Sequence, residues 1–300
     1  MYHVPVLLNE TVDGLNIQPN GTYVDITFGG GGHAREVLKR LAKKGRLIAF
    51  DQDPDAVQNA AAIGDKRLTL VQGSFRFLRS YLRYHNAAQV DGILGDLGVS
   101  WHQFDTADRG FSFRFDANLD MRMNNRGGLT AANILNTYSI EQLTKIFRLY
   151  GELDNAYKLA QMVEKVRTNT PLENIAQLTE SIRAALPKFD EHKYLAKVFQ
   201  ALRIEVNQEM VALEQMLLQT EKVVKTGGRL SVITYHSLED RMVKNYIKCG
   251  NVEGAVKKDL FGKFSAPFEA VTKKIILPQE IEIQNNTRAR SAKLRVAERI

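Results

Sequence analysis

The sequence has very little cysteine. Its 300 residues include a single one, Cys249, which excludes an internal disulfide and a zinc site built from several thiolates. Residues 1–10 lack a basic start followed by a long apolar run, and no later stretch approaches the ~18 consecutive apolar residues of a membrane helix. These absences predict a cytoplasmic protein that is neither exported nor embedded in a membrane.

The remaining composition is that of an ordinary globular protein, with 44% hydrophobic and 25% charged residues. Lysine and arginine outnumber aspartate and glutamate by 41 to 34, which gives a formal net charge of +7. An excess of this size favours a polyanionic partner such as RNA, although many proteins carry one without binding any polyanion.

The order of apolar runs predicts an α/β fold. Short apolar runs alternate with helix-like stretches from residue 22 to residue 100, as in a parallel sheet covered by helices. The predicted strands are 22–26, 46–50, 68–72, 90–94, 227–235, 268–277 and 292–297, and the first two predicted helices are 34–43 and 56–62. From about residue 130 to beyond residue 220 the sequence is almost wholly helical, with helix starts at Ser139 and at Thr170-Pro171. We therefore expect one α/β domain, residues 1–108 and 206–300, interrupted by a mostly helical insertion, residues 109–205.

A glycine-rich loop follows the first predicted strand. Asp25 ends that strand, and four consecutive glycines, residues 29–32, lead into a helix near His33. Backbone amides in such a loop can approach a ligand closely, which predicts a site for a nucleoside-containing cofactor. Gly29, Gly31 and Ala34 also fit the G-x-G-x-x-A pattern of a dinucleotide site, so NAD competes with S-adenosylmethionine.

Two features near the loop, Asp25 and Phe75, favour S-adenosylmethionine, whereas the acid at Asp51 fits the dinucleotide pattern as well. Asp25 can hold a cationic amino acid moiety, and Phe75 follows the third predicted strand, where an adenine base can stack. Asp51 ends the second predicted strand, where a carboxylate can bind both ribose hydroxyls. Asp53 is its rival for that role, but it could instead cap the next helix.

The fourth predicted strand leads to Asp96, the candidate catalytic residue. An aromatic amine is a poor nucleophile because its lone pair is delocalised into the ring, and a carboxylate that accepts its hydrogen bond would help. Alternatively, Asp96 caps a turn or binds the cofactor. Methylation of a pyrimidine carbon would need a nucleophile such as a thiolate, and Cys249 lies at the predicted end of a helix, so an amine is the better target.

His236 follows the fifth predicted strand and is the second catalytic candidate. It could contact the target base or relay a proton, or it could merely order the turn between strand and helix.

The RNA-binding candidates combine cations with aromatic residues. Arg109, Phe111 and Arg114 lie in a segment suited to phosphate contact and base stacking, which assigns RNA recognition to the insertion. The alternative is that the aromatic residues anchor the insertion from inside its core. Arg288 and Arg290 add positive charge near the end of the chain. No set of metal ligands is predicted.

Several motifs in order resemble the bacterial 16S rRNA cytosine-N4 methyltransferase family, which modifies cytosine 1402 of the decoding region. The most specific motifs are residues 27–33, 96–100, 109–113, 119–123, 199–204, 236–241 and 288–291. The resemblance implies a Rossmann-like S-adenosylmethionine-dependent methyltransferase sheet with an inserted helical domain, acting on 16S rRNA within the small ribosomal subunit. A homodimer is compatible with it.

The family resemblance also implies the cofactor contacts. They fall on Gly31, Gly32, His33, Asp51, Phe75, Asp96 and Gln103. Two departures from the family pattern stand near them: Ser100-Trp101-His102-Gln103 replaces Ser-Ser-Pro-Gln, and Asn124 replaces an aspartate. Two other functions stay open at this point, an NAD-dependent oxidoreductase and a non-catalytic RNA-binding assembly factor.

Overall fold

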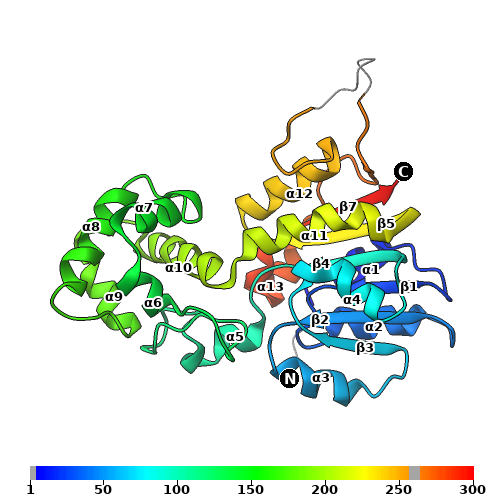
Figure 1. Cartoon of the computed structure of the whole chain (residues 1–300), viewed down its shortest axis with the longest axis horizontal. Coiled ribbons are helices and arrows are strands. Elements are labelled where there is room, and N and C mark those ends of the chain that lie inside the picture. Colours follow the sequence, from blue (N-terminus) through cyan, green and yellow to red (C-terminus); the bar gives the residue numbers. More distant parts are fainter. Residues whose placement is uncertain (1–4, 257–263) are drawn as a thin grey trace. The chain divides into compact units, whose positions relative to one another are not determined.

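The computed structural model describes residues 5–256 and 264–300 and divides into two compact units (Figure 1). The first unit consists of Met1–Gly98 and Met210–Ile300, and the second of Val99–Glu209. The sequence predicts these boundaries at 108/109 and 205/206. The observed ones differ because Val99, Phe104 and Val206 all pack against the hydrophobic core of the helical unit.

Seven strands form one sheet within the described part of the first unit. They are β1 (Thr22–Asp25), β2 (Arg46–Asp51), β3 (Leu68–Gln72), β4 (Val90–Asp96), β5 (Val224–Thr234), β6 (Phe268–Ala270) and β7 (Lys293–Arg299). Their order is β3-β2-β1-β4-β5-β7-β6. The strands β1 to β5 are parallel to one another, whereas β7 runs antiparallel to both β5 and β6. The predicted α/β class is confirmed.

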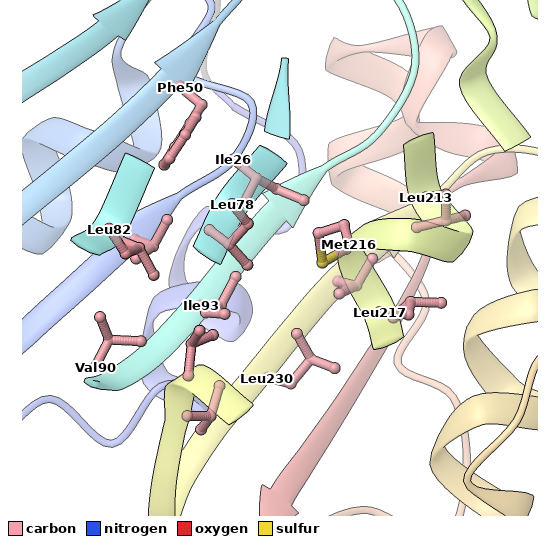
Figure 2. Close-up of a cluster of buried hydrophobic side chains, with 14 of the residues drawn as sticks. Ile26, Phe50, Leu78, Leu82, Val90, Ile93, Leu213, Met216, Leu217 and Leu230 are labelled. Carbon is pink, nitrogen blue, oxygen red and sulfur yellow. The ribbon is translucent and has the colours of Figure 1, made fainter. Parts of the chain in front are cut away.

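Helices cover both faces of this sheet, because the inner strands are apolar on both sides. In β2, Ile48 and Phe50 pack on one face and Leu47 and Ala49 on the other. The first face is closed by residues of α4 (Leu78–Tyr84), α11 (Glu209–Val223) and α12 (Ser237–Cys249). Figure 2 shows side chains from α4 and α11, Leu78 and Met216 among them, gathered against this face.

The opposite face is covered by residues of α1 (Leu8–Gly14), α2 (Gly32–Arg40) and α3 (Asp55–Ile63). The helices α2 and α3 correspond to the two predicted at 34–43 and 56–62. The remaining short elements of the unit are η1 (Phe75–Phe77), α13 (Glu280–Asn285) and η4 (Thr287–Ser291).

The predicted strand 268–277 is wrong in its length. Pairing ends after Ala270, and Ile276 makes a single bridge to Leu294. Lys273 and Lys274 between them are exposed, so this stretch has no alternating buried face to hold it in a sheet.

The regular elements of the second unit, within its described residues, are all helices, joined by turns and by one isolated bridge between Asn118 and Asn174. Its elements are α5 (Trp101–Asp105), η2 (Ala107–Arg109), α6 (Ala131–Thr137), α7 (Ile140–Leu149), α8 (Ala156–Arg167), α9 (Ile175–Ser181), η3 (Arg183–Ala185) and α10 (Glu191–Asn207). Ser139 caps α7 through a capping box, as predicted. The start predicted at Thr170-Pro171 is wrong, because α9 begins after Asn174, which forms the capping box with Gln177.

Among the helices in the part of the chain that the structure describes, none is long and apolar enough to span a membrane.

Candidate functional site

The predicted acidic residues come together at one edge of the sheet. Asp25, Asp51 and Asp96 end β1, β2 and β4, which are adjacent and parallel. The chain runs from β1 outward to β2 and β3 on one side and continues with β4 and β5 on the other. Ligands of open α/β sheets bind in the crevice at such a reversal of strand order.

The glycine loop is open toward a ligand at Gly29 and packed at its other end. Gly29 has φ +52°, and a Cβ there would have only Thr27 O within reach, at 4.0 Å. A Cβ at Gly31 would lie 2.9 Å from atoms of Ile63 and Phe28, and one at Gly32 would lie 2.1 Å from Pro5 Cγ. A side chain is therefore disfavoured by the backbone conformation at Gly29, and it is excluded by neighbouring atoms at Gly31 and Gly32.

Asp51 fastens this loop to the end of β2. Its Oδ2 accepts from Gly29 N at 2.7 Å and its Oδ1 from Asp53 N at 2.8 Å. Burial raises the pKa of Asp51 to about 6, although these amides act in the opposite direction. The backbone amide of Gln52 acts on this carboxylate as well, so of its about four acceptor positions roughly one remains for a ligand. Asp53 instead accepts from Asp55 N at the start of α3.

Phe75 lies close to Asp51 along the same edge. Gly73 N donates to the backbone oxygen of Asp51 at 2.8 Å, and Ser74 caps η1, which begins at Phe75. The ring is partly buried against the sheet core. Gly73 is bonded to Asp51, and Phe75 follows Gly73 by two residues. The aromatic ring of Phe75 is therefore tied through the backbone to the end of β2.

Asp25 is fully buried. Its Oδ1 accepts from Thr27 N at 3.0 Å, and its Oδ2 has no hydrogen-bond partner among the described residues. Burial raises the pKa of Asp25 to about 7, with a further contribution from Asp96 and Asp51. A buried acceptor of this kind suits a cationic or hydrogen-bonding ligand group.

Asp96 is held by contacts from three other segments. Its backbone N donates to Thr27 Oγ1 at 2.6 Å, its Oδ1 accepts from the Tyr235 hydroxyl at 2.7 Å, and its Oδ2 lies 3.9 Å from His33 Nδ1. Its side chain remains 23% exposed. Burial raises the pKa of Asp96 to about 7, the Tyr235 hydrogen bond lowers it, and the charge of Glu239 raises it.

His33 is buried at the start of α2, and burial lowers its pKa to about 4. Its ring is therefore neutral at physiological pH. Nε2 lies 3.2 Å from Val6 O, and because a carbonyl can only accept, we assign the ring proton to Nε2. Nδ1, the nitrogen that faces Asp96, is then an acceptor.

His236 forms the N-cap of α12. Glu239 N donates to His236 Nδ1 at 3.4 Å, and the Glu239 carboxylate accepts from His236 N at 3.4 Å. This geometry matches the turn-ordering role that the sequence left open, and a contact with the target base or a proton relay stays a prediction.

The other predicted residues are divided between the two units. In the helical unit, Gln103 is buried and accepts from Ser100 N at 3.2 Å in the capping box of α5. In the sheet unit, Arg288 and Arg290 lie in η4, where Arg288 is half-buried and Arg290 is exposed. Their roles toward cofactor and RNA stay predictions.

The aromatic–cationic segment of the helical unit is partly internal. Phe111 is 4% exposed and belongs to the hydrophobic core, whereas Arg114 is exposed. Arg109 donates to the backbone oxygens of Arg122 and Met123, both at 3.0 Å. The structure thus favours the anchor alternative for Phe111, because a ring packed inside a core cannot stack on a base.

Sequence reasoning missed Tyr235 and Glu239. Tyr235 is bound to Asp96 through its hydroxyl and to Glu239 Oε2 through its backbone N, at 2.9 Å. Glu239 is buried. The available signal was position: Tyr235 directly follows a parallel strand, β5, at the edge where Asp96 ends its neighbour β4.

Comparisons with known proteins cover the whole chain. A family model described as the MraW methylase family matches residues 1–300. Two relatives carry the name ribosomal RNA small subunit methyltransferase H. The one from Bacteroides fragilis strain YCH46 is 58% identical over 298 residues, covering 99% of this chain and 97% of its own. The one from Parabacteroides distasonis is 55% identical over 300 residues, covering 100% and 98%.

Likeness to solved structures is weaker. The crystal structure of TrmN from Thermus thermophilus has a TM-score of 0.45 and 10% identity, covering 98% of this chain and 48% of that one.

Proposed function

We propose, from the premise that this chain belongs to the MraW methylase family, that it transfers a methyl group from S-adenosylmethionine to the exocyclic N4 amine of cytosine 1402 in 16S rRNA. The names of its relatives support ribosomal RNA of the small subunit as the substrate class. Within the site, one observation carries the choice of an amine: Asp96 presents a partly exposed carboxylate oxygen, Oδ2, at the carboxyl edge of the sheet.

The residues of the glycine loop and the neighbouring strand end fit this cofactor. Gly29 leaves open space on the side where other residues carry a Cβ, Asp51 retains acceptor capacity for a ribose hydroxyl, and Asp25 carries a buried acceptor without a partner in the described chain. The residues proposed to hold the cofactor are Gly31, Gly32, His33, Asp51, Phe75, Asp96 and Gln103. When bound, S-adenosylmethionine supplies an electrophilic methyl group on a sulfonium. Membership of a methylase family disfavours the NAD-dependent alternative.

Asp96 then acts on the amine. Accepting a hydrogen bond from the N4 amine localises the nitrogen lone pair and stabilises the positive charge that develops as the new carbon–nitrogen bond forms. The carboxylate must be ionised to do so. Because burial raises the pKa of Asp96 to about 7, we expect kcat/KM to fall as the pH drops below about 7.

Methylation at a ring carbon does not fit the chain. That reaction needs a nucleophile that adds to the ring, usually a thiolate. Cys249, the single cysteine of the sequence, is buried at the end of α12.

The test is methyl transfer from labelled S-adenosylmethionine to purified small subunits and to naked 16S rRNA, with the product nucleoside identified by mass spectrometry. N4-methylcytidine at position 1402 supports the proposal. A different methylated nucleoside overturns the target, and RNA binding without cofactor binding would favour the assembly-factor alternative. The Asp96→Asn variant should lose at least ~100-fold in kcat, and near-normal turnover would remove Asp96 from the chemical step.

A further inference from the structure

We propose that Tyr235 is a positioning residue for methyl transfer, whose hydroxyl holds Asp96 Oδ1 so that Oδ2 receives the target amine. The inference rests on the proposed function, because it takes from there the role of Asp96 as the acceptor of that amine.

Tyr235 is held in place through both its hydroxyl and its backbone. Its hydroxyl lies 2.7 Å from Asp96 Oδ1, and its backbone N donates to Glu239 Oε2 at 2.9 Å. Its ring packs against a cluster of buried side chains that includes Ile233 and Leu294. Because β4 and β5 pair with Asp96 opposite Ile233, sheet register sets the distance between the two residues.

The direction of this hydrogen bond is also fixed. Burial, and next the charge of Asp96, raise the pKa of Tyr235 well above 10. The phenol therefore keeps its proton throughout the range in which the enzyme would work, and it donates to the ionised carboxylate. One oxygen of Asp96 is thereby occupied.

The second oxygen faces an acceptor. No hydrogen bond within the described residues reaches Asp96 Oδ2, and His33 Nδ1 lies 3.9 Å from it. Since the His33 ring carries its proton on Nε2, toward Val6 O, Nδ1 cannot donate to Asp96. Two acceptors that face each other match a ligand group with N–H donors, and an exocyclic amine is such a group.

The groups around Asp96 come from four segments: Asp25 at the end of β1, His33 in α2, Tyr235 after β5 and Glu239 in α12. Two of them are carboxylates, which disfavour ionisation of Asp96, and His33 is neutral. Tyr235 stabilises the ionised form, because a donor to a carboxylate favours its charge. Removing that hydroxyl should raise the pKa of Asp96.

The first experiment compares Tyr235→Phe with wild type in full-length protein. We expect kcat to fall about ten- to a hundredfold, the usual effect of losing a hydrogen bond to a charged group. The acidic limb of the pH–rate profile should move to higher pH, because the Asp96 carboxylate loses the donor that favours its ionised form. An unchanged kcat and pH profile would overturn the inference.

Tyr246→Phe is the matched control. Tyr246 is 1% exposed, and its hydroxyl lies 3.1 Å from Thr220 Oγ1 in the same unit. Losing that hydroxyl should affect thermal stability but leave the pH–rate profile in place. A shift of the acidic limb in this variant as large as in Tyr235→Phe would contradict a specific role for Tyr235.

A second variant covers the case in which Tyr235→Phe fails to fold. Incorporating 3-fluorotyrosine at position 235 keeps the shape of the ring and makes the hydroxyl a stronger donor. The acidic limb should then move to lower pH, opposite to the phenylalanine variant, and an unmoved limb would overturn the inference. Wild-type activity separates the two proposals: no N4-methylcytidine from wild type defeats the proposed function, whereas an active wild type with insensitive variants defeats only the role of Tyr235.

Discussion

The carboxylate of Asp51 accepts a hydrogen bond from the backbone amide of Gly29 at 2.7 Å, although 22 residues separate them along the chain. The contact ties the tip of β2 to the glycine loop that follows β1. One side chain thus shapes the loop and, in the proposed function, also binds the ribose. Cofactor affinity and loop conformation should therefore change together when this carboxylate is altered.

Asp51→Asn is expected to weaken S-adenosylmethionine binding at least ~10-fold, because the amide keeps only one acceptor oxygen and loses the charge that strengthens bonds to ribose hydroxyls. Calorimetric titration measures the effect. Asp53→Asn is the matched control, since asparagine can still accept a hydrogen bond from Asp55 N, and the affinity of this variant should stay within about twofold of wild type. Equal losses in the two variants would mean that Asp53 shares the ligand role.

Gly29→Ala should weaken S-adenosylmethionine binding, and backbone strain alone should not account for the loss. Gly29 and Gly227 both have positive φ, +52° and +78°, and a Cβ on either meets little or no protein. The strain should cost about 1 kcal/mol in each variant. Only at Gly29 would the methyl group project toward the proposed cofactor. Calorimetry should thus show at least ~10-fold weaker binding for Gly29→Ala and unchanged binding for Gly227→Ala, and similar affinities would place the cofactor elsewhere.

Asp25 should make stability fall as the pH rises. Its pKa is raised by burial to about 7 in the folded protein from an ordinary value of 3.8. Between these values the folded state binds more protons than the unfolded state, so the free energy of unfolding decreases with increasing pH across this window. Asp25→Asn mimics the neutral acid and can still accept from Thr27 N.

We therefore expect the stability advantage of Asp25→Asn over wild type to be larger at pH 8 than at pH 5 by about 1–3 kcal/mol. Denaturant unfolding at the two pH values, without cofactor, measures the difference. A stability change that is the same at both would show that Asp25 is not the buried group that titrates.

The sequence predicted the sheet well where strands are buried on both faces. In β2 and β4, runs of apolar residues must be buried on both sides, and the acids that end them then share one edge by the geometry of parallel strands. Sequence reasoning was least reliable at the sheet margin. It extended the strand at Phe268 far beyond Ala270, because a short edge strand depends on pairing with a single neighbour rather than on its own pattern.

The site was predictable in position but not in detail. Asp25, Asp51 and Asp96 follow from strand ends, whereas the bond between Tyr235 and Asp96 joins residues 139 positions apart. A pattern read within one short segment of the sequence cannot reveal a contact between residues so far apart along the chain. The turn-ordering contacts of His236 with Glu239 likewise exist only in the folded turn.

Two residues of the segment 109–114 are expected to have different roles, one in core packing and one in RNA binding. Phe111 is 4% exposed in the core of the helical unit, and Arg114, three residues later, is exposed. Phe111→Ala should destabilise that unit by about 3–5 kcal/mol, the usual cost of emptying an aromatic site in a core. Arg114→Ala should leave the unfolding midpoint unchanged.

Arg114→Ala should instead weaken binding to 16S rRNA and lower the slope of log K against log salt concentration by about 1, the contribution of one phosphate contact. Titrating labelled rRNA at several salt concentrations measures it, with Arg126→Ala, another exposed arginine of the same unit, as a control for general loss of charge. If Arg114→Ala and Arg126→Ala reduce the slope equally, the helical unit attracts RNA by diffuse charge. A reduction confined to Arg114→Ala would mean that the exposed end of this segment contacts RNA while its buried ring holds the segment in place.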